Sequence, residues 1–172
     1  MEIRSIGIIG AGQMGNGIAH VTALAGYRVV MMDISQDSLT AALSLIEKNL
    51  ERQVSSAKIT AAEKAKALAQ IDTTLDISKV GQADLVIEAA TEDETIKQSI
   101  FDLLLPHLQD HTILTSNTSS ISITRLASRT DRPEKFMGFH FMNPVPVMKL
   151  VELIRGIATD ETTYAACKQV VE

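Results

Sequence analysis

The sequence contains very few cysteines and aromatic residues. Cys167 is the only cysteine, so no disulfide can form within the chain. Tryptophan is absent and aromatic residues make up 3% of the chain, which argues against the stacking platforms that bind single-stranded nucleic acids. A strand-like segment begins almost at the N-terminus, so we expect no signal peptide. These features are typical of a protein of the reducing cytoplasm, where we expect this one.

Long apolar runs and clusters of positive charge are also missing. No run approaches the roughly 20 apolar residues that a membrane-spanning helix needs. The formal net charge is −5 and no stretch is strongly basic, so we expect neither a membrane nor a nucleic acid as partner. The 172 residues are 45% hydrophobic and 22% charged, which suits one globular domain with a sizeable core.

A glycine-rich stretch near the N-terminus organises the rest of the chain. The apolar residues 6–9 are typical of a buried strand, and Gly10, Gly12 and Gly15 follow them, ahead of apolar residues at helical spacing. The glycines therefore lie where a strand becomes a helix. Gly10 allows a tight turn, Gly12 lets backbone amides approach a pyrophosphate, and Gly15 lets the helix pack closely on the strand. The amides and dipole of the helix would face the phosphates.

An acidic residue stands where this motif predicts one. Residues 28–32 form a second apolar strand, and Asp33 ends it, about 20 residues past the glycines. A carboxylate there can accept both ribose hydroxyls of an adenosine and would repel a 2′-phosphate, and no arginine follows directly. The pattern therefore predicts NAD rather than NADP as cofactor. The alternative is a glycine-rich turn that binds nothing.

Two helices are predicted between the second strand and the next one, as a hairpin inserted over about residues 36–70. Ser35 or Asp37 can cap the first helix, and Thr60 with Glu63 forms a capping box for the second, Ala61–Ala69. Basic residues on the hairpin are either a solvated face or a site for a phosphate-bearing substrate tail; they are Lys48, Arg52, Lys58, Lys64 and Lys66.

Further strands are predicted at residues 75–77, 85–89 and 112–115. In a doubly wound sheet the carboxyl ends of strands present ligand groups. Glu92 and Lys97 follow the second of these strands and are therefore candidates for cofactor contacts, although Glu92 could equally serve at a helix N-terminus. The loop Ser116–Ser120 follows the third strand. Helix capping needs only one such residue, so five polar residues in a row favour binding of a carbonyl or hydroxyl group.

The last strands carry a histidine and a glutamate that can meet. Strands are predicted at 136–141 and 149–154, and the loop between them is too short for a parallel crossover, so they should run antiparallel. If Met142 pairs with Leu150, then His140 lies opposite Glu152, with Cβ atoms about 5 Å apart. Such a pair can fix the imidazole tautomer and take a proton from an alcohol. An ion pair on a sheet edge is the alternative; the other histidines show no comparable partner.

Three segments together resemble the NAD-binding domain of the L-3-hydroxyacyl-CoA dehydrogenase family. They read Gly-Ala-Gly-Gln-Met-Gly from Gly10, Ser-Asn-Thr-Ser-Ser from Ser116, and His-Phe-Met-Asn-Pro-Val-Pro-Val-Met-Lys-Leu-Val-Glu from His140. The family usually has Phe where Met142 stands. The resemblance runs essentially from end to end and implies a Rossmann-like α/β fold, with a mostly parallel, doubly wound sheet, a helical-hairpin insert and an antiparallel last strand.

The resemblance also implies the reaction and its residues. NAD would oxidise a 3-hydroxyacyl-CoA, with 3-hydroxybutyryl-CoA favoured, to a 3-oxoacyl-CoA, and no metal is implied. His140 would be the base, Glu152 its partner, and Ser119 the residue that hydrogen-bonds the substrate 3-oxygen. The cofactor site would comprise Gly10, Gly12, Gln13, Met14, Gly15, Asp33, Glu92, Lys97, Asn117 and Asn143.

The family normally continues into a helical C-terminal domain, which supplies a substrate-contacting asparagine and the dimer surface. That domain is absent from residues 1–172, so we expect a homodimer only together with it. Where the family contacts acyl-CoA with a Ser and a Lys, this chain has Asn49 and Ser56, and Lys48, Arg52 and Lys58 are possible substitutes. Two alternatives remain open: an NAD-binding module without turnover of its own, and a relative that acts on a free hydroxy acid or sugar acid.

Overall fold

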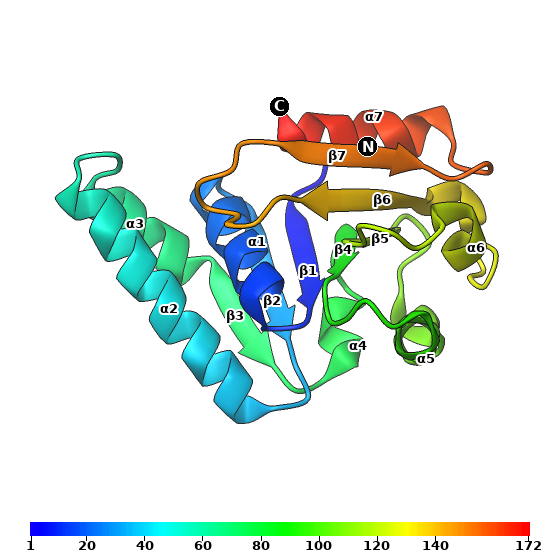
Figure 1. Ribbon diagram of the computed structural model, residues 1–172, viewed down its shortest axis with the longest axis horizontal. Coiled ribbons are helices and arrows are strands. Elements are labelled where there is room, and N and C mark those ends of the chain that lie inside the picture. The colour runs from blue at the N-terminus through cyan, green and yellow to red at the C-terminus, as the bar shows by residue number, and fades with distance from the viewer.

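A computed structural model describes residues 1–172 as a seven-stranded sheet with helices on both faces (Figure 1). The strand order is β3-β2-β1-β4-β5-β6-β7, and every neighbouring pair is parallel except β6 and β7. The predicted Rossmann-like, doubly wound fold with an antiparallel last strand is thus confirmed. The strands are β1 Ser5–Ile9, β2 Arg28–Met32, β3 Ile71–Thr74, β4 Leu85–Glu88, β5 Ile113–Ser116, β6 Phe136–Phe141 and β7 Val151–Arg155.

Side chains that alternate along the strands form two cores, one on each face of the sheet. On one face Ile6 and Ile8 of β1 pack with helices α1, α2, α3 and α7. On the other face Ile9 packs with α4, α5 and α6, where Phe101 meets the ring of Phe136 edge-on. The helices are α1 Gln13–Leu24, α2 Gln36–Ser55, α3 Ala61–Ala69, α4 Ile77–Val80, α5 Glu94–Leu104, α6 Ile123–Ala127 and α7 Glu161–Val171. Short 3₁₀ turns follow α5 and precede β6. None of the helices is long and apolar enough to cross a membrane.

The helical hairpin forms as predicted and projects beside the sheet (Figure 1). Ser35 caps α2, and Thr60 and Glu63 form both hydrogen bonds of a capping box at the start of α3. One apolar stripe of α2, including Ile46 and Leu50, is fully buried against α1. This packing fixes the hairpin to the helix that follows the glycine-rich loop.

The strand predicted at residues 75–77 is wrong. The third strand is β3, Ile71–Thr74, and Ile77 already begins α4, which Asp76 caps through the amide of Ser78. The prediction failed because β3 is an edge strand with one exposed acid, so its apolar content is low. Asp76 is a helix cap, which the apolar residues on either side of it concealed.

The order in which the chain adds strands to the sheet reverses between β1 and β4. From β1 the chain builds outward through β2 and β3 on one side, and from β4 through β5 and β6 on the other. The loops after β1 and β4 therefore diverge at this point, which is where ligands bind in open α/β sheets. They also touch, since a Cβ atom on Gly10 would come within 2.6 Å of the Ala89 carbonyl oxygen.

Candidate active site

Nearly all of the predicted site residues lie at the carboxyl edge of the sheet. The glycine-rich loop follows β1, Asp33 follows β2, Glu92 follows β4, and Asn117 follows β5. His140 lies near the carboxyl end of β6. Because these strands are parallel, residues up to 130 positions apart in the sequence meet there. One such contact joins Gln13 Nε2 to Asn143 Oδ1 at 3.2 Å.

The helix after the glycine-rich loop differs from all the others at its N-terminus. Gly12 precedes α1 without a side-chain hydrogen bond, and the first turn contains no acidic residue. Each of the other six α-helices has a side chain that accepts from its first-turn amides: Ser35, Thr60, Asp76, Asp93, Ser122 and Asp160. An uncapped, positively polarised helix end is a ready site for an anion.

The glycines of this loop also fit a ligand. A Cβ atom on Gly15 would lie 1.8 Å from the Gly10 carbonyl oxygen, so protein packing alone requires that glycine. A Cβ atom on Gly12 would meet nothing within 4 Å. The open space beside Gly12 leaves room for a pyrophosphate to approach the uncapped helix end. The loop therefore fits the dinucleotide predicted from its sequence.

The Asp33 carboxylate is oriented by two backbone amides. Its Oδ2 accepts from Ala11 N at 2.9 Å and its Oδ1 from Ser35 N at 3.0 Å. A carboxylate oxygen can accept more than one hydrogen bond, so both oxygens keep capacity for hydroxyl donors. Asp33 thus presents a fixed acceptor beside the glycine-rich loop, as a site for ribose hydroxyls requires.

His140 and Glu152 lie directly opposite each other in the β6–β7 ladder, in the predicted register. The His140 Nδ1 and Glu152 Oε2 atoms are 2.9 Å apart. The imidazole is largely covered, with 18% of its side chain exposed, and the Glu152 side chain is half exposed. If Nδ1 carries the proton that Glu152 accepts, Nε2 is left with its lone pair. The pair can then act as a base toward a hydroxyl group.

A depression of about 210 Å³ brings several predicted residues together. The predicted site residues that do not line it are Gly10, Gly12, Gln13, Gly15, Asp33, Lys97 and Glu152. The lining residues are Met14, Glu92, Asn117, Ser119, His140, Phe141, Met142 and Asn143. One hollow therefore collects side chains from the first turn of α1, the loops after β4 and β5, the end of β6 and the β6–β7 turn.

The loop Ser116–Ser120 does not cap the following helix, because Ser122 caps α6. Its side chains instead hold the site together. Asn117 Oδ1 accepts from the Phe141 amide at 2.8 Å, next to His140. Glu92 Oε2 accepts from Thr118 Oγ1 at 3.0 Å and from the amide of Ser119 at 3.4 Å. Glu92 is likewise not the cap of α5, since Asp93 has that role.

Lys97, predicted to belong to the cofactor site, lies inside the protein behind Glu92. Its side chain is fully buried and bonds Glu88, while Glu92 Oε1 lies 4.0 Å from Nζ. Glu88 is equally buried at the end of β4. The sequence offered one sign of this pair, an acid that ends an otherwise apolar strand. Burial of a charge in such a place demands a partner, and only the fold reveals which one.

Two other histidines have partners that the sequence did not indicate. His111 Nε2 lies 2.9 Å from Asp84 Oδ1 at the opposite edge of the sheet. His20 on α1 is buried, and its Nε2 lies 2.9 Å from Gln53 Oε1 on α2. Burial lowers the pKa of His20 and so favours its neutral form, although the hydrogen bond to Gln53 acts in the opposite direction. The expectation that only His140 has a carboxylate partner is therefore wrong for His111.

The fold and this edge define a dinucleotide-binding α/β domain with a histidine–carboxylate pair beside the cofactor loop. Residues 5–172 match the family described as "3-hydroxyacyl-CoA dehydrogenase, NAD binding domain". The chain belongs to this family of NAD-binding domains.

Relatives and solved structures agree with this assignment. The chain is 55% identical over 169 residues to a 3-hydroxybutyryl-CoA dehydrogenase of Bradyrhizobium diazoefficiens, covering 98% of this chain and 58% of the relative. The crystal structure of (S)-3-hydroxybutyryl-CoA dehydrogenase from Ralstonia eutropha superposes with a TM-score of 0.95 at 46% identity, covering 99% of this chain and 62% of that one. The 3-hydroxybutyryl-CoA dehydrogenase structure from Escherichia coli gives a TM-score of 0.96 at 40% identity, covering 99% and 36%. This chain thus spans about 58% of the Bradyrhizobium relative.

Proposed function

We propose that this chain forms the cofactor half of an active site that oxidises a 3-hydroxyacyl-CoA, with 3-hydroxybutyryl-CoA as the favoured substrate. The observation that carries the proposal is the His140–Glu152 pair, whose histidine shares one hollow with Met14 from the first turn of α1, the helix that follows the glycine-rich loop. Relatives of 44–55% identity carry the name 3-hydroxybutyryl-CoA dehydrogenase.

In this reaction His140 is the base. Glu152 accepts the Nδ1 proton, fixes the ring and stabilises its charged form. Nε2 then takes the proton of the substrate 3-hydroxyl, while the Ser119 hydroxyl holds the same oxygen. NAD, when bound, would supply the redox chemistry as the acceptor for the hydride of C3. The oxygen thus loses its proton and C3 its hydride, which leaves the 3-oxo product.

The cofactor is held by the residues around the glycine-rich loop. Gly10, Gly12 and Gly15 shape the loop, and the first-turn amides of α1, with Gln13 and Met14, meet the pyrophosphate. Asp33 binds the adenosine ribose. Glu92, Asn117 and Asn143 meet the nicotinamide half, because they share the hollow with His140.

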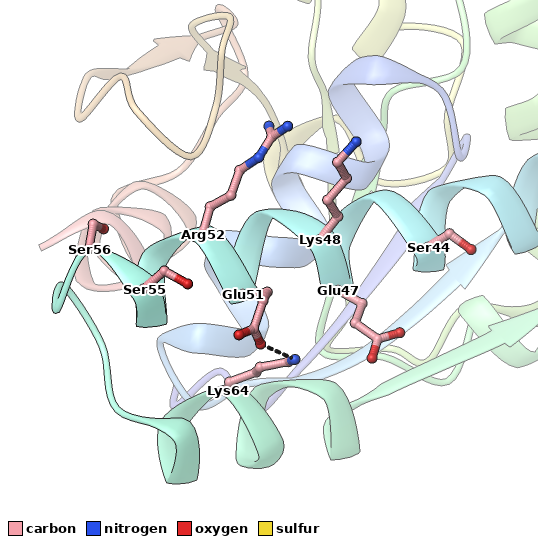
Figure 2. A pocket seen from close by; sticks show the side chains of 8 residues that line it. All are labelled: Ser44, Glu47, Lys48, Glu51, Arg52, Ser55, Ser56 and Lys64. Carbon is pink, nitrogen blue, oxygen red and sulfur yellow. Dashed lines mark hydrogen bonds and ion pairs between the residues drawn. The ribbon is translucent and has the colours of Figure 1, made fainter.

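The acyl-CoA tail fits the basic side of the hairpin. A hollow of about 720 Å³ runs along α2, with Lys64 as its one lining residue from α3. Figure 2 shows Lys48 and Arg52 pointing away from Glu47 and Glu51 of the same helix. Lys64 is paired with Glu51 at 2.6 Å. Arg52 and Lys58 line a second hollow, of about 350 Å³, together with Asn49, Ser56 and residues Pro144, Pro146 and Val147. Since that loop follows the His140 strand, a tail held there runs toward the base.

Charge reversal tests this assignment. In a form able to turn over, Lys48→Glu with Arg52→Glu should raise the KM for acyl-CoA severalfold, because the phosphates lose their cations. Lys66→Glu is the matched control, since Lys66 lies on the same hairpin but lines neither hollow. Equal KM values for the double variant and the control would remove the basic residues from the site.

A second candidate is an NAD-binding module without turnover of its own. The observation that favours it is length, because the chain covers 58% of the Bradyrhizobium relative. An acyl pocket shared with the remaining part would be incomplete here. A third candidate, oxidation of a free hydroxy acid, needs no site for the CoA phosphates and would leave the basic hairpin unused.

One experiment separates the three. NADH binding and oxidation of 3-hydroxybutyryl-CoA and free 3-hydroxybutyrate are measured on this chain and on a fusion to the remaining C-terminal part of the Bradyrhizobium relative. Binding by both, with acyl-CoA turnover by the fusion, supports the dehydrogenase. Binding without turnover in either supports the module, and turnover of free acid supports the third candidate. A chain that binds no NADH contradicts all three.

A further inference from the structure

A buried ion pair lies directly beneath the proposed nicotinamide half of the site. Lys97 on α5 bonds the Glu88 carboxylate at the end of β4, and both side chains are fully buried. Removing two charges from water is costly, and a buried pair replaced by apolar residues of similar volume often leaves a protein equally stable. Stability alone is therefore a weak reason for this pair, which lies where three site segments meet.

Glu88 contacts each of those three segments. Its Oε1 accepts from Lys97 of α5 and from Ser116 Oγ of β5, the latter at 2.7 Å. Its Oε2 accepts from Ala90 N at 2.9 Å, within the turn that leads to Glu92. Its backbone carbonyl accepts from Asn117 N at 2.8 Å. One carboxylate residue thus fixes the turn after β4, the start of α5 and the loop after β5.

Lys97 also lies close to a second carboxylate, that of Glu92, which is nearer the surface than Glu88. Glu92 Oε1 lies 4.0 Å from the Lys97 ammonium, and the Glu92 side chain is half exposed. The other oxygen of Glu92 accepts from Thr118, Ser119 and Ser120, the loop that carries the proposed substrate-binding serine. Lys97 therefore lies between a fully enclosed carboxylate and one that holds the Ser119 loop.

We propose that Glu88 is a positioning residue of this site, acting on cofactor binding through Lys97 and Glu92. Glu88 holds the ammonium beneath Glu92, the ammonium holds the Glu92 carboxylate between α5 and the Ser119 loop, and Glu92 meets the cofactor. Without Glu88, the ammonium has only Glu92 to neutralise it and draws that carboxylate inward, away from Thr118 and Ser119. This inference rests on the proposed function, because it needs the cofactor to meet Glu92.

A double-mutant cycle on NADH affinity tests whether Glu88 acts on the cofactor through Glu92. The wild-type chain, Glu88→Gln, Glu92→Gln and the double variant are titrated with NADH at a temperature where all are folded. We expect Glu88→Gln to raise the dissociation constant at least tenfold, and to add less than twofold in the Glu92→Gln background, because the route to the cofactor is already cut. Phe101→Leu is the matched control, since it loosens the same helix from the other core and should change NADH affinity less than twofold.

Each outcome decides the proposal. A tenfold loss from Glu88→Gln in both backgrounds, or an equal loss from Phe101→Leu, would show a merely structural role and overturn it. Unchanged affinity in Glu88→Gln would also overturn it. If Glu88→Gln does not fold, the variant that combines Glu88→Gln with Lys97→Met removes both buried charges and replaces it. Its NADH affinity is then compared with and without Glu92→Gln in the same way. A wild-type chain that binds no NADH contradicts the proposed function instead.

Discussion

The two histidine–carboxylate pairs at opposite edges of the sheet have equally short contacts and different surroundings, and His140 uses Nδ1 where His111 uses Nε2. His140–Glu152 and His111–Asp84 both have a nitrogen–oxygen distance of 2.9 Å. Asp84 also accepts from the amides of Arg4 and Ser5 and from the Ser5 hydroxyl. Glu152 has no other hydrogen-bond partner than His140.

The difference shows that a short contact between imidazole and carboxylate does not define a base. Asp84 and His111 precede β4 and β5 at the amino edge, where Asp84 joins the N-terminal segment to the sheet. His140 and Glu152 face the carboxyl edge, where the ligand groups of a doubly wound sheet gather. Position in the sheet and freedom from structural contacts distinguish the candidate catalytic pair.

The largest expected difference between the two pairs is in kcat after each imidazole is removed. In the fusion able to turn over, His140→Gln should lower kcat about a thousandfold, since general bases contribute roughly 10²–10⁴ in rate. NADH affinity should stay within twofold. His111→Gln is the control and should leave kcat within twofold. Near-normal kcat in His140→Gln, measured by NADH formation, would refute the base assignment.

Loss of the Glu152 charge should have a smaller effect. Glu152→Gln keeps a hydrogen-bond acceptor at Nδ1 but removes the charge that stabilises the imidazolium. A hydrogen bond to a charged group contributes about 1.5–3 kcal/mol, so kcat should fall about thirtyfold. Asp84→Asn supplies the matched change at the other edge. If both variants lowered kcat equally, the distinction between the edges would fail.

A third change concerns another carboxylate at the carboxyl edge, Asp33. Asp33→Ala removes the acceptor for ribose hydroxyls, so NADH affinity should fall about tenfold. The discrimination against NADPH should fall with it, because no charge then repels a 2′-phosphate. Asp37→Ala, on the first turn of α2, is the control. Titration with both nucleotides measures the result, and unchanged affinity for both would remove Asp33 from the site.

The smallest effect is expected in how the stability of the protein depends on pH, through Asp84 at the amino edge of the sheet. Burial acts to raise the pKa of Asp84, but hydrogen bonds from Arg4, His111 and Ser5 outweigh it and hold the pKa below the ordinary value of 3.8. A carboxyl whose pKa is lowered by folding stabilises the protein above its unfolded pKa, and this contribution is lost as pH falls through the folded value. Urea unfolding should therefore show Asp84→Asn less stable at pH 7, with the difference narrowing below about pH 4. A difference independent of pH would contradict this.

Local patterns predicted the parts of the site that depend on the chain nearby. The glycine spacing and Asp33 follow from one strand–helix–strand unit. A short loop predicted that the strands of His140 and Glu152 run antiparallel, and the register assumed for them is the one observed. The burial of Lys97 could not be predicted in this way, because its partner Glu88 and its neighbour Glu92 meet it only when β4 and α5 pack. His111 was missed for the same reason, since Asp84 lies 27 residues away.

The uncapped N-terminus of α1 has a consequence for the stability of the folded chain. The other six α-helices begin at a side chain that accepts from their first-turn amides, whereas the first-turn amides of α1 have no such partner and remain open to an anionic ligand. A ligand that binds the folded form alone raises the free energy of unfolding by RT ln(1 + [L]/Kd). The dinucleotide is thus also a folding partner. When NAD is scarce, the free energy of unfolding falls toward that of the ligand-free chain, so the stability of this domain depends on the supply of its cofactor.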